Sequence, residues 1–495
     1  MDADVVVVGA GPTGLLLAGD LAEAGVAVTV LERRTHESNV TRAFAVHART
    51  MEELDIRGVA GELAKTGTPI RQLNLFDRVH IDLSRLPSDF AFLLITPQYQ
   101  TERVLQHRAD ALGVRIIRGA EVTGVTQDAD GVEVTTRTDD GGADCYRARY
   151  LVGADGVHSA VRRAIGLPFP GRSVIKSIML ADVQLRTPPA DVLAVNAVGD
   201  AFAFVAPFGD GWYRIFAWNR RNQVDAQAAV DLEEIREVTR RALGTDFGMH
   251  DPRWLSRFHS DERQAPRYRV GRVFLAGDAA HCHSPAGGQG MNTGMQDAAN
   301  LGWKLAAAVH GWGGDVLLDS YHQERYPVGR QVLRSSGAIL RLALIRPRWA
   351  RQARNMIGQT LMGIPPLAAV VAGTISGIGI RYPAPPGADR RVGTRMPNIP
   401  LTGGRLHDAL RGGRFVLVGT GATGVALPVH VDAAVPAQST GELVLVRPDG
   451  YLAWVGTASE FTSWARQYFS GSSKPVEQPD FSGSSQPVEQ PVNTQ

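Results

Sequence analysis

The sequence predicts an α/β protein (α+β overall), in which a Rossmann-like nucleotide-binding domain is interrupted by a middle domain with an antiparallel sheet. Residues 4–32 read as a buried strand, a helix and a second strand, which is the βαβ opening of a parallel sheet. Residues 173–221 instead alternate between apolar and polar side chains, as strands of a half-buried antiparallel sheet do. The α/β pattern returns at residues 272–276, so both domains are expected to be discontinuous.

The expected division of the chain follows from these changes of pattern. We expect a nucleotide-binding domain at 1–70, 97–172 and 268–385, a middle substrate-binding domain at 71–96 and 173–267, and a small C-terminal segment at 386–460, after a proline-rich linker. Residues 469–492 contain two nearly identical twelve-residue units rich in Ser, Pro and Gln, which are too polar to build a core. Residues 461–495 are therefore expected to form a disordered tail.

Composition excludes several classes of protein. The 52 basic and 50 acidic residues give a net charge of +2, too even for a generic nucleic-acid binder. Two cysteines cannot build a disulfide framework or a zinc site, and they fit a reducing cytoplasm. The N-terminus lacks signal-peptide features, and the longest apolar run, residues 365–380, is shorter than the ~20 residues that span a bilayer. We expect a cytoplasmic protein without a membrane span.

The first motif with chemical meaning is Gly9-Ala-Gly-Pro-Thr-Gly14, directly after a strand and at the start of a helix. Such glycines permit a tight turn and close approach of a pyrophosphate to the backbone, while the helix N-terminus stabilises its charge. Glu32 ends the second strand, where a carboxylate can accept hydrogen bonds from ribose hydroxyls. The motif predicts dinucleotide binding; the alternative is a tight turn that binds nothing.

Two later motifs also place backbone donors after a strand. Asp155-Gly156 precedes a short helix, and an ordinary Asp-capped helix is the alternative interpretation. Asp278 ends a third strand and is followed by a Gly/Pro-rich loop, which allows main chain to lie against a flat ring. A helix expected near Gly294 would then present its positive end to that ring.

The three motifs together resemble those of the FAD-dependent aromatic hydroxylases with the para-hydroxybenzoate hydroxylase fold (class A flavoprotein monooxygenases), most closely the branch that tailors polycyclic aromatic polyketides. The resemblance covers residues 1–385 and implies FAD binding. The residues that it implicates are Gly9, Gly11, Pro12, Thr13, Gly14, Glu32 and Arg33 for the ADP half, Arg42 near the pyrophosphate and nicotinamide, Val122 beside adenine, Gln98, Arg103 and Asp278 for the ribityl chain, Asp155 and Gly156 for FAD and NADPH, and Pro285, Gly288, Gly290, Met291 and Asn292 around the isoalloxazine ring.

The resemblance also implies a reaction. NADPH (or NADH) would reduce FAD, dioxygen would add to give a flavin 4a-hydroperoxide near Pro285, and a phenolic polycyclic aromatic substrate would be hydroxylated. No catalytic base can be assigned from the sequence. The alternatives are Baeyer–Villiger oxygen insertion, a different flavoprotein reaction such as halogenation or reduction, and a non-oxygenating FAD-binding partner protein. No nucleic-acid or membrane partner is expected, and the chain is expected to be a monomer or homodimer.

The remaining conspicuous residues receive structural interpretations. Residues 414–419 and 445–451 resemble the first and last strands of a thioredoxin-like domain, so 386–460 is expected to be a truncated remnant. A second glycine triplet, Gly419-Thr-Gly-Ala-Thr-Gly424, is expected to be a loop because Pro428 follows it closely. No metal is expected at His281-Cys282-His283. His47 is expected to pack or to lie at the surface, and the middle-domain aromatics Phe202, Phe204, Trp212, Phe216 and Trp218 to pack in a core, although alternate ones could line a flat pocket.

Overall fold

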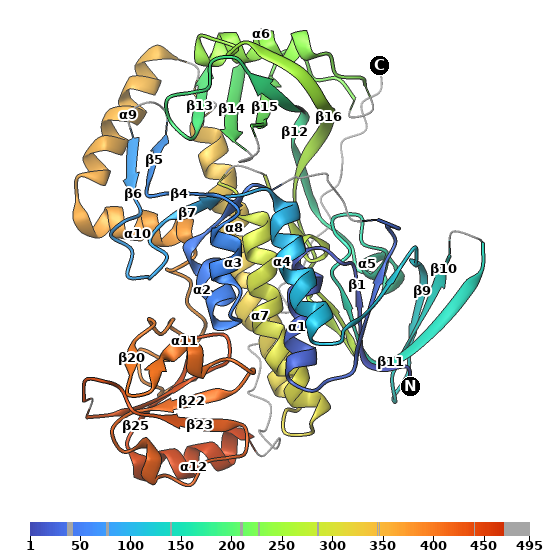
Figure 1. The fold of residues 1–495 in the computed structure, drawn as a ribbon, viewed down its shortest axis with the longest axis vertical. Helices are drawn as coiled ribbons and strands as arrows, with labels where there is room; N and C mark the ends of the chain where they lie inside the picture. The colour runs from blue at the N-terminus through green and yellow to red at the C-terminus, as the bar shows by residue number, and fades with distance from the viewer. Residues whose placement is uncertain are drawn as a thin grey trace, which may run out of the picture.

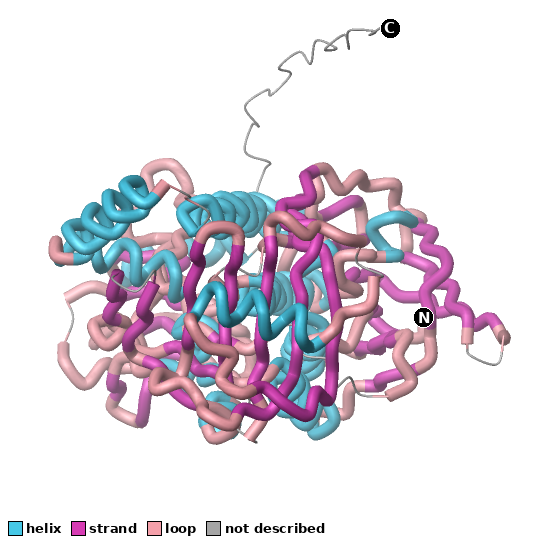
Figure 2. Tube along the Cα trace, turned by 90° about the horizontal axis from the view of Figure 1, so that it is seen from above, coloured by secondary structure: helices cyan, strands magenta, loops and turns pink. Residues whose placement is uncertain are grey.

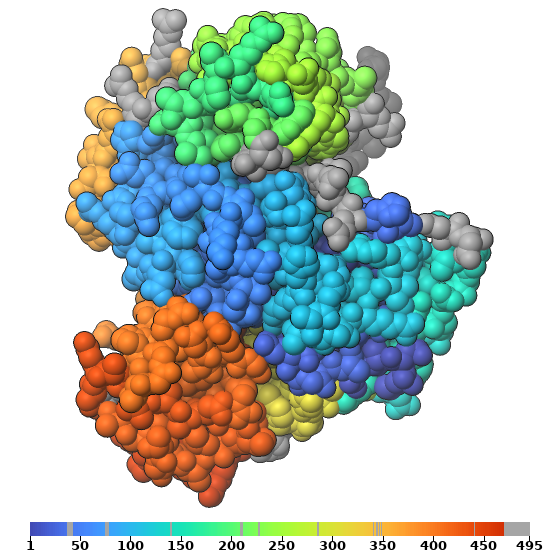
Figure 3. Space-filling model, in the orientation of Figure 1, coloured from blue at the N-terminus to red at the C-terminus, as the bar shows by residue number. Residues whose placement is uncertain are grey.

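A computed structural model describes residues 1–36, 43–75, 79–138, 141–207, 211–225, 228–284, 287–343, 345, 347–439 and 441–469. Figure 1 shows three regions along the long axis: an antiparallel sheet at the top, a largely parallel sheet with long helices in the middle, and a small sheet with short helices at the bottom. In the space-filling view of Figure 3, N-terminal residues lie between the green middle domain and the red-orange C-terminal segment.

The main sheet has the strand order β17-β18-β11-β1-β2-β8, with β10 paired to β11 and β9 paired to β10. Strands β18, β11, β1, β2 and β8 are parallel to one another, and β9, β10 and β17 are antiparallel additions. The strands are β1 (Ala3–Val8), β2 (Val28–Glu32), β8 (Arg115–Arg118), β9 (Glu121–Gln127), β10 (Val132–Arg137), β11 (Ala143–Gly153), β17 (Arg269–Val270) and β18 (Val273–Leu275). Because β1, β11 and β18 are parallel neighbours, these three strands, which are far apart in the sequence, all end on the same, carboxyl-terminal side of the sheet.

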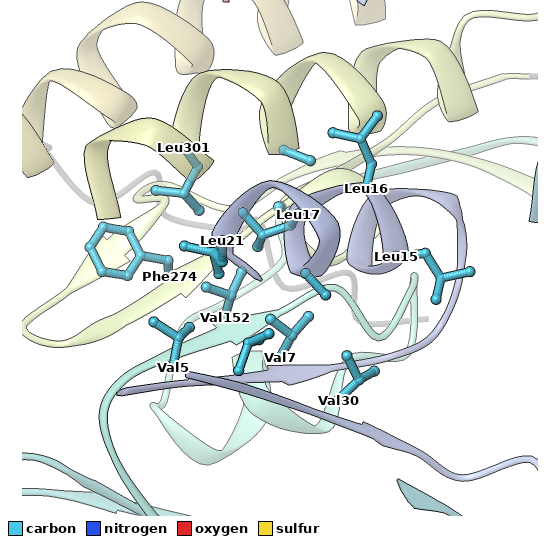
Figure 4. Close-up of a cluster of buried hydrophobic side chains, with 14 of the residues drawn as sticks. Val5, Val7, Leu15, Leu16, Leu17, Leu21, Val30, Val152, Phe274 and Leu301 are labelled. Carbon is cyan, nitrogen blue, oxygen red and sulfur yellow. The ribbon is translucent and has the colours of Figure 1, made fainter. Parts of the chain in front are cut away.

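Helix α1 (Pro12–Glu23) lies between this sheet and helix α7 (Gly290–Val309). Its leucines fill the space in Figure 4, with the sheet valines below them and Leu301 of α7 above. The apolar residues sit around most of α1 because both of its sides are covered. The labelled members of this core are Val5, Val7, Leu15, Leu16, Leu17, Leu21, Val30, Val152, Phe274 and Leu301, each 1% exposed or less.

The middle domain is an antiparallel sheet of strand order β13-β14-β15-β12-β16-β19, built from β12 (Gly171–Leu185), β13 (Ala194–Val198), β14 (Ala201–Pro207), β15 (Tyr213–Asn219), β16 (Met249–Gln264) and β19 (His281–Cys282). Helix α6 (Leu232–Leu243) lies across one face (Figure 2). Period-two alternation sends small residues such as Ala203 and Ala217 toward α6, and aromatic ones such as Phe204 and Phe216 to the opposite face. Strand β19 belongs to the third motif, so it ties that motif to the middle sheet.

Two small sheets and the other helices connect these regions. One sheet has the order β3-β7-β4 and the other pairs β5 with β6. The elements are β3 (Ala45–Val46), β4 (Thr68–Ile70), β5 (Gln72–Leu75), β6 (Val79–Asp82), β7 (Leu93–Ile95), α2 (Ala48–Ile56), α3 (Ala60–Ala64), α4 (Gln98–Ala111), α5 (Ala160–Ala164), the 3₁₀ turn η1 (Gly277–Ala279), α8 (Asp315–Ala343), α9 (Arg348–Met362) and α10 (Pro365–Ser376). Helix α7 begins at Gly290 rather than near Gly294, so Met291 and Asn292 lie in its first turn and not in the preceding loop.

The C-terminal segment contains a mixed sheet of order β23-β22-β24-β25, in which β22 and β23 are parallel and the other neighbours antiparallel. Its elements are β20 (Pro400–Leu401), β21 (Gly404–Arg405), α11 (Leu406–Ala409), β22 (Phe415–Val418), η2 (Ala422–Gly424), β23 (Val431–Ala434), β24 (Leu443–Val446), β25 (Leu452–Gly456) and α12 (Ala458–Phe469). The Gly419–Gly424 triplet lies in a loop with one 3₁₀ turn, as expected.

The expected start of the disordered tail at residue 461 is wrong. Helix α12 continues to Phe469, because Phe461, Ala465 and Phe469 recur at helical spacing and bury against the C-terminal sheet. The repeated Ser/Pro/Gln units from residue 470 onward lie outside the described residues.

Candidate functional site

We call the turns that follow β1, β11 and β18 the first, second and third glycine corners; they contain Gly9–Gly14, Asp155–Gly156 and Gly277–Asp278. The first corner lies against the second. Gly9 has φ +104°, and a Cβ there would lie 2.5 Å from the carbonyl oxygen of Ala154. A Cβ on Gly14 would lie 2.0 Å from the Gly9 oxygen, so α1 can approach β1 only without a side chain at that position. A Cβ on Gly11, by contrast, would meet nothing within 4 Å. The two outer glycines therefore serve packing, and Gly11 alone faces open space at the N-terminus of α1.

The third corner meets the first through Thr13. Gly277 and Gly294 approach it so closely that added Cβ atoms would lie 2.8 and 2.4 Å from the Thr13 hydroxyl oxygen. Pro12 occupies the first turn of α1, where its missing N–H costs no hydrogen bond. The structure thus brings together Gly9, Asp155 and Gly277, which are far apart in the sequence.

Glu32 is buried at the end of β2 beside this corner. Its carboxylate accepts hydrogen bonds from the N–H of Ala10 (2.7 Å) and from the N–H and Nε of Arg34 (2.9 Å each). Burial opposes its ionisation, but these hydrogen bonds prevail and lower the pKa of Glu32. From the described part of the chain, its Oε2 accepts only the bond from Ala10, so this oxygen can accept a further bond from a ligand hydroxyl. The neighbouring Arg33 is exposed.

The residues assigned to the adenine and ribityl contacts differ in their surroundings. Val122 is buried on β9, next to Ala120, whose N–H donates to the Glu32 carbonyl (3.0 Å). Gln98 begins α4 and accepts a hydrogen bond from the Ala43 N–H (3.2 Å), whereas Arg103 is exposed and bonds to Gln100. Arg42 lies outside the described residues.

Asp155 caps the start of helix α5 with one carboxylate oxygen and leaves the other oxygen free for a ligand. One carboxylate oxygen accepts from the N–H groups of Ala160 (2.6 Å) and Val161 (3.2 Å), which start α5. The other oxygen is buried and has no partner. Burial raises the pKa of Asp155. Gly156 has φ +80° and faces open space. A buried acceptor without a donor is the kind of atom that a bound ligand satisfies.

Asp278 is exposed on η1, and the turn that carries it is fixed from below by Asp297. Asp297 on α7 is fully buried; it accepts from the Gly277 N–H (3.0 Å) and from Arg325 Nε (2.7 Å), and its Oδ2 lies 2.6 Å from His281 Nε2. Burial opposes ionisation of Asp297, but His281 and Arg325 lower its pKa. The carboxylate therefore stays charged and ties three segments to the third corner.

The loop after β19 reaches the small β3–β7–β4 sheet. Asn292 is buried; its oxygen accepts from the His47 N–H (2.8 Å), and its amide donates to the carbonyls of Ala45 (2.9 Å) and Gly288 (2.8 Å). His47 Nε2 lies 3.0 Å from the Gly287 carbonyl oxygen. A Cβ on Gly290 would touch the His283 ring at 3.4 Å. Pro285 and Ala286 lie outside the described residues, but both of their flanks are fixed.

A cavity of about 520 Å³ separates this loop from the aromatic face of the middle sheet. Its size is that of a pocket for a small organic ligand. Ser284, Gly287 and Gly288 form the loop side, and Phe44, Phe202, Phe204, Phe216 and Trp218 line the opposite side. Phe44 contacts Phe204 and Phe216 with ring centroids 4.8 and 5.6 Å apart.

The structure decides between the interpretations of the middle-domain aromatics and of His47. Four of the five middle-domain aromatics line the cavity rather than only packing in a core, because period-two alternation places them on the face opposite α6. Trp212 is the exception and stacks with Arg253 at 4.6 Å. His47 is buried at the N-terminus of α2, as the packing interpretation expects, and it also lines the cavity.

Acidification from pH 7.5 to 5 is expected to remove about 2 kcal/mol of unfolding free energy through His47. Burial lowers the pKa of His47 from 6.5 to about 4, despite hydrogen bonds to Gly287 and Gly288 that raise it. Between these two values the unfolded state binds more protons than the folded state, so stability falls as the pH falls. Urea unfolding of wild type and His47→Gln at both pH values measures this contribution. Equal pH dependence in both proteins would contradict a neutral, buried His47.

Sequence reasoning missed Asp297, Arg325 and the segment at Phe44–Ala45. Asp297 and Arg325 lie on long helices, and their partners are distant in sequence, so no local spacing marks them. Within the described residues, no group of three or more His, Cys, Asp or Glu side chains could bind a metal ion. Cys282 is buried as a free thiol, and its neighbour His281 is directed to Asp297.

The fold and the three converging corners define a dinucleotide-binding protein whose second domain covers an aromatic-lined cavity. Among families, the FAD binding domain matches residues 2–336, and the C-terminal region of aromatic-ring hydroxylases matches residues 389–470. Rifampicin monooxygenase of Streptomyces venezuelae is 39% identical over 462 residues, which cover 92% of this chain and 95% of that protein.

Solved structures agree with the sequence matches. The OxyS anhydrotetracycline hydroxylase of Streptomyces rimosus superposes with a TM-score of 0.83 at 37% identity, covering 95% of this chain and 99% of that one. The Diels-Alderase PyrE3 of pyrroindomycin biosynthesis superposes with a TM-score of 0.80 at 34% identity, covering 94% and 99%. This chain belongs to the FAD-dependent aromatic hydroxylases of the polyketide-tailoring branch and is a flavin-dependent monooxygenase.

The site has features that fit FAD. Gly11 leaves open space at a helix N-terminus, where a pyrophosphate can receive backbone hydrogen bonds. Glu32 lies buried at the end of β2, and Asp155 presents an unpartnered buried oxygen close to Gly9.

Proposed function

We propose that the protein hydroxylates a phenolic polycyclic aromatic compound with NADPH as reductant, through the flavin 4a-hydroperoxide that the family resemblance implies. The observation that carries this proposal is the 520 Å³ cavity between the loop of the third corner and the aromatic face of the middle sheet. Flat rings can stack on Phe204 and Phe216 there, and the apolar lining excludes water from the reacting atoms.

The proposed cofactor contacts follow the convergence of the corners. The ADP half of FAD lies along Gly9–Gly14, with Glu32 and Val122 beside its ribose and adenine. Gln98, Arg103 and Asp278 are assigned to its ribityl chain, Asp155 and Gly156 to contacts with FAD and NADPH, and Arg42 to the pyrophosphate and nicotinamide side. Arg33 is assigned to the ADP half. The flanks of Pro285, from Gly288 to Asn292, are proposed to lie against the isoalloxazine ring. The protein binds and orients FAD in this account, and FAD supplies the redox chemistry.

Substrate-stimulated NADPH oxidation tests the proposal. With a panel of phenolic polycyclic compounds, one should accelerate NADPH consumption and gain one oxygen atom without releasing peroxide. Phe204→Ala is expected to raise the KM for that compound about tenfold or more, since burying an aromatic ring contributes ~1.5–3 kcal/mol. Trp212→Ala, outside the cavity lining, is the matched control and should leave KM unchanged. Equal KM values for the two variants would contradict binding in this cavity.

Two other activities remain open on the same scaffold. Baeyer–Villiger insertion also adds one oxygen, so product NMR separates a new ring hydroxyl from a lactone. A non-oxygenating role deserves a test because PyrE3, a structural relative, is described as a Diels-Alderase. NADPH oxidation that no phenolic compound stimulates would favour such a role over hydroxylation.

A further inference from the structure

Helices α9 and α10 lie at the edge of the molecule (Figure 1), and they and the turn between them carry seven large apolar side chains that are 41–73% exposed. We call this the α9–α10 patch. Its most exposed members are Trp349 (73%), Met356 (65%) and Val370 (65%). Its other members are Ile357, Leu361, Ile364 and Leu367, each more than 40% exposed. Single exposed apolar residues are ordinary, but a patch of this extent marks an interaction surface.

The patch results from the sequence of α9. Trp349 is followed seven, eight and twelve positions later by Met356, Ile357 and Leu361. This helical spacing places the four side chains on one side of α9. The opposite side carries Gly358, where a Cβ would lie 2.7 Å from Val79 of β6. The helix therefore packs on the protein through a small residue and turns its large apolar residues outward.

The surrounding chain has an unusual charge. From residue 325 to residue 388 there are nine arginines and no lysine, aspartate or glutamate, although the whole chain has a net charge of only +2. Among these, Arg341 is exposed on α8 and precedes Leu342, whose carbonyl accepts a hydrogen bond from Arg354 of α9 (2.9 Å), so Arg341 lies close to α9. Arg351 is half-buried, and its spacing from Trp349 places it on the side of α9 that carries Gly358. An apolar helix face with basic flanks and an exposed tryptophan is the chemistry of helices that lie in the surface of a bilayer.

We propose that the α9–α10 patch binds the surface of a membrane that contains anionic phospholipids. Trp349 and the neighbouring aliphatic side chains enter the acyl boundary, while the arginines contact the headgroup phosphates. A second copy of the chain is the less favourable occupant, since a symmetric contact would place the same arginine-rich segments against each other without acidic partners.

The geometry fits surface binding rather than a span. Among the described residues, no single helix is long and apolar enough to cross a bilayer. The helices Trp349–Met362 and Pro365–Ser376 reach that length and apolarity only when they are taken together, and a bend of 103° separates them. Ile375 of α10 and Ile339 of α8 line the large cavity. The proposed membrane surface is therefore joined to the cavity through α10, and an apolar aromatic compound dissolved in the bilayer would enter from there.

Flotation of the purified holoenzyme with vesicles tests the proposal. Wild type should float with vesicles of phosphatidylglycerol and phosphatidylcholine (1:1), should float much less with phosphatidylcholine alone, and should dissociate at high salt. Arg341→Glu is expected to weaken binding about fivefold or more, because one arginine near an anionic surface contributes about fivefold. Trp349→Ala is expected to weaken binding by a similar factor, because it removes the largest apolar side chain of the patch from the acyl boundary.

Matched controls come from the C-terminal segment. Val429→Ser removes an apolar side chain that is even more exposed (85%) than Trp349 (73%), and Arg466→Glu makes the same charge change on α12; both should bind vesicles as wild type does. Flavin content verifies the fold of every variant. Wild type that does not bind anionic vesicles, or patch variants that bind like the controls, would overturn the proposal. Self-association that Trp349→Ala abolishes, without vesicle binding, would assign the patch to a second copy instead.

Discussion

Gly11→Val is expected to give a folded protein whose affinity for FAD is reduced at least about a hundredfold. The open space at Gly11 means that the Cβ of the new side chain meets no protein atom within 4 Å. It would occupy the approach of the pyrophosphate to the N-terminus of α1 and remove two or so charge-assisted hydrogen bonds, each contributing ~1.5–3 kcal/mol. Equilibrium titration of apoprotein with FAD, followed by fluorescence, measures the affinity.

Gly61→Val is the matched control, because a Cβ at Gly61 on α3 also meets nothing within 4 Å but lies outside the glycine corners. It should retain wild-type affinity. Gly14→Ala forms a contrasting case, since its Cβ would collide with the Gly9 carbonyl and disturb the fold. Tight FAD binding by Gly11→Val would refute the assigned position of the pyrophosphate.

Asp297→Ala is expected to reduce the free energy of unfolding by about 3–5 kcal/mol, since it leaves the buried charge of Arg325 without its partner. It also frees the Gly277 N–H and the His281 ring, so the turn that carries Asp278 loses its support. Urea unfolding of the apoprotein measures the loss, and FAD titration measures the effect on the turn.

Asp432→Ala is the control for that substitution. Asp432 also pairs with an arginine, Arg414, but both side chains are 40% exposed or more, and such pairs contribute ~0–1 kcal/mol. A similar loss for both variants would show that Asp297 is not the buried anchor of the third corner.

Much of the fold could be predicted from local sequence. The run of valines before Gly9 and the leucines of α1 have the periods of a buried strand and helix, and the structure contains both. The alternation of residues 201–219 correctly predicted strands, but the sequence alone could not decide which face is a core. That decision depends on α6, which covers Ala203 and Ala217 and leaves Phe204 and Phe216 facing the cavity.

Contacts between distant segments could not be predicted from spacing. Asp297, Arg325 and His281 meet only after α7, α8 and β19 have packed, and His47 reaches the cavity only because Asn292 fixes its backbone. The start of the expected tail was misplaced for a different reason. The polar repeats dominate the composition after residue 461, and they obscure the helical spacing of Phe461, Ala465 and Phe469.

Three glycine corners, far apart in the sequence, are proposed to form one FAD site. The visible absorption spectrum of the purified protein tests this, with the flavin released and quantified before and after reconstitution with FAD. We expect the absorption bands of isoalloxazine and one FAD for each chain. A protein that remains colourless after reconstitution would contradict it.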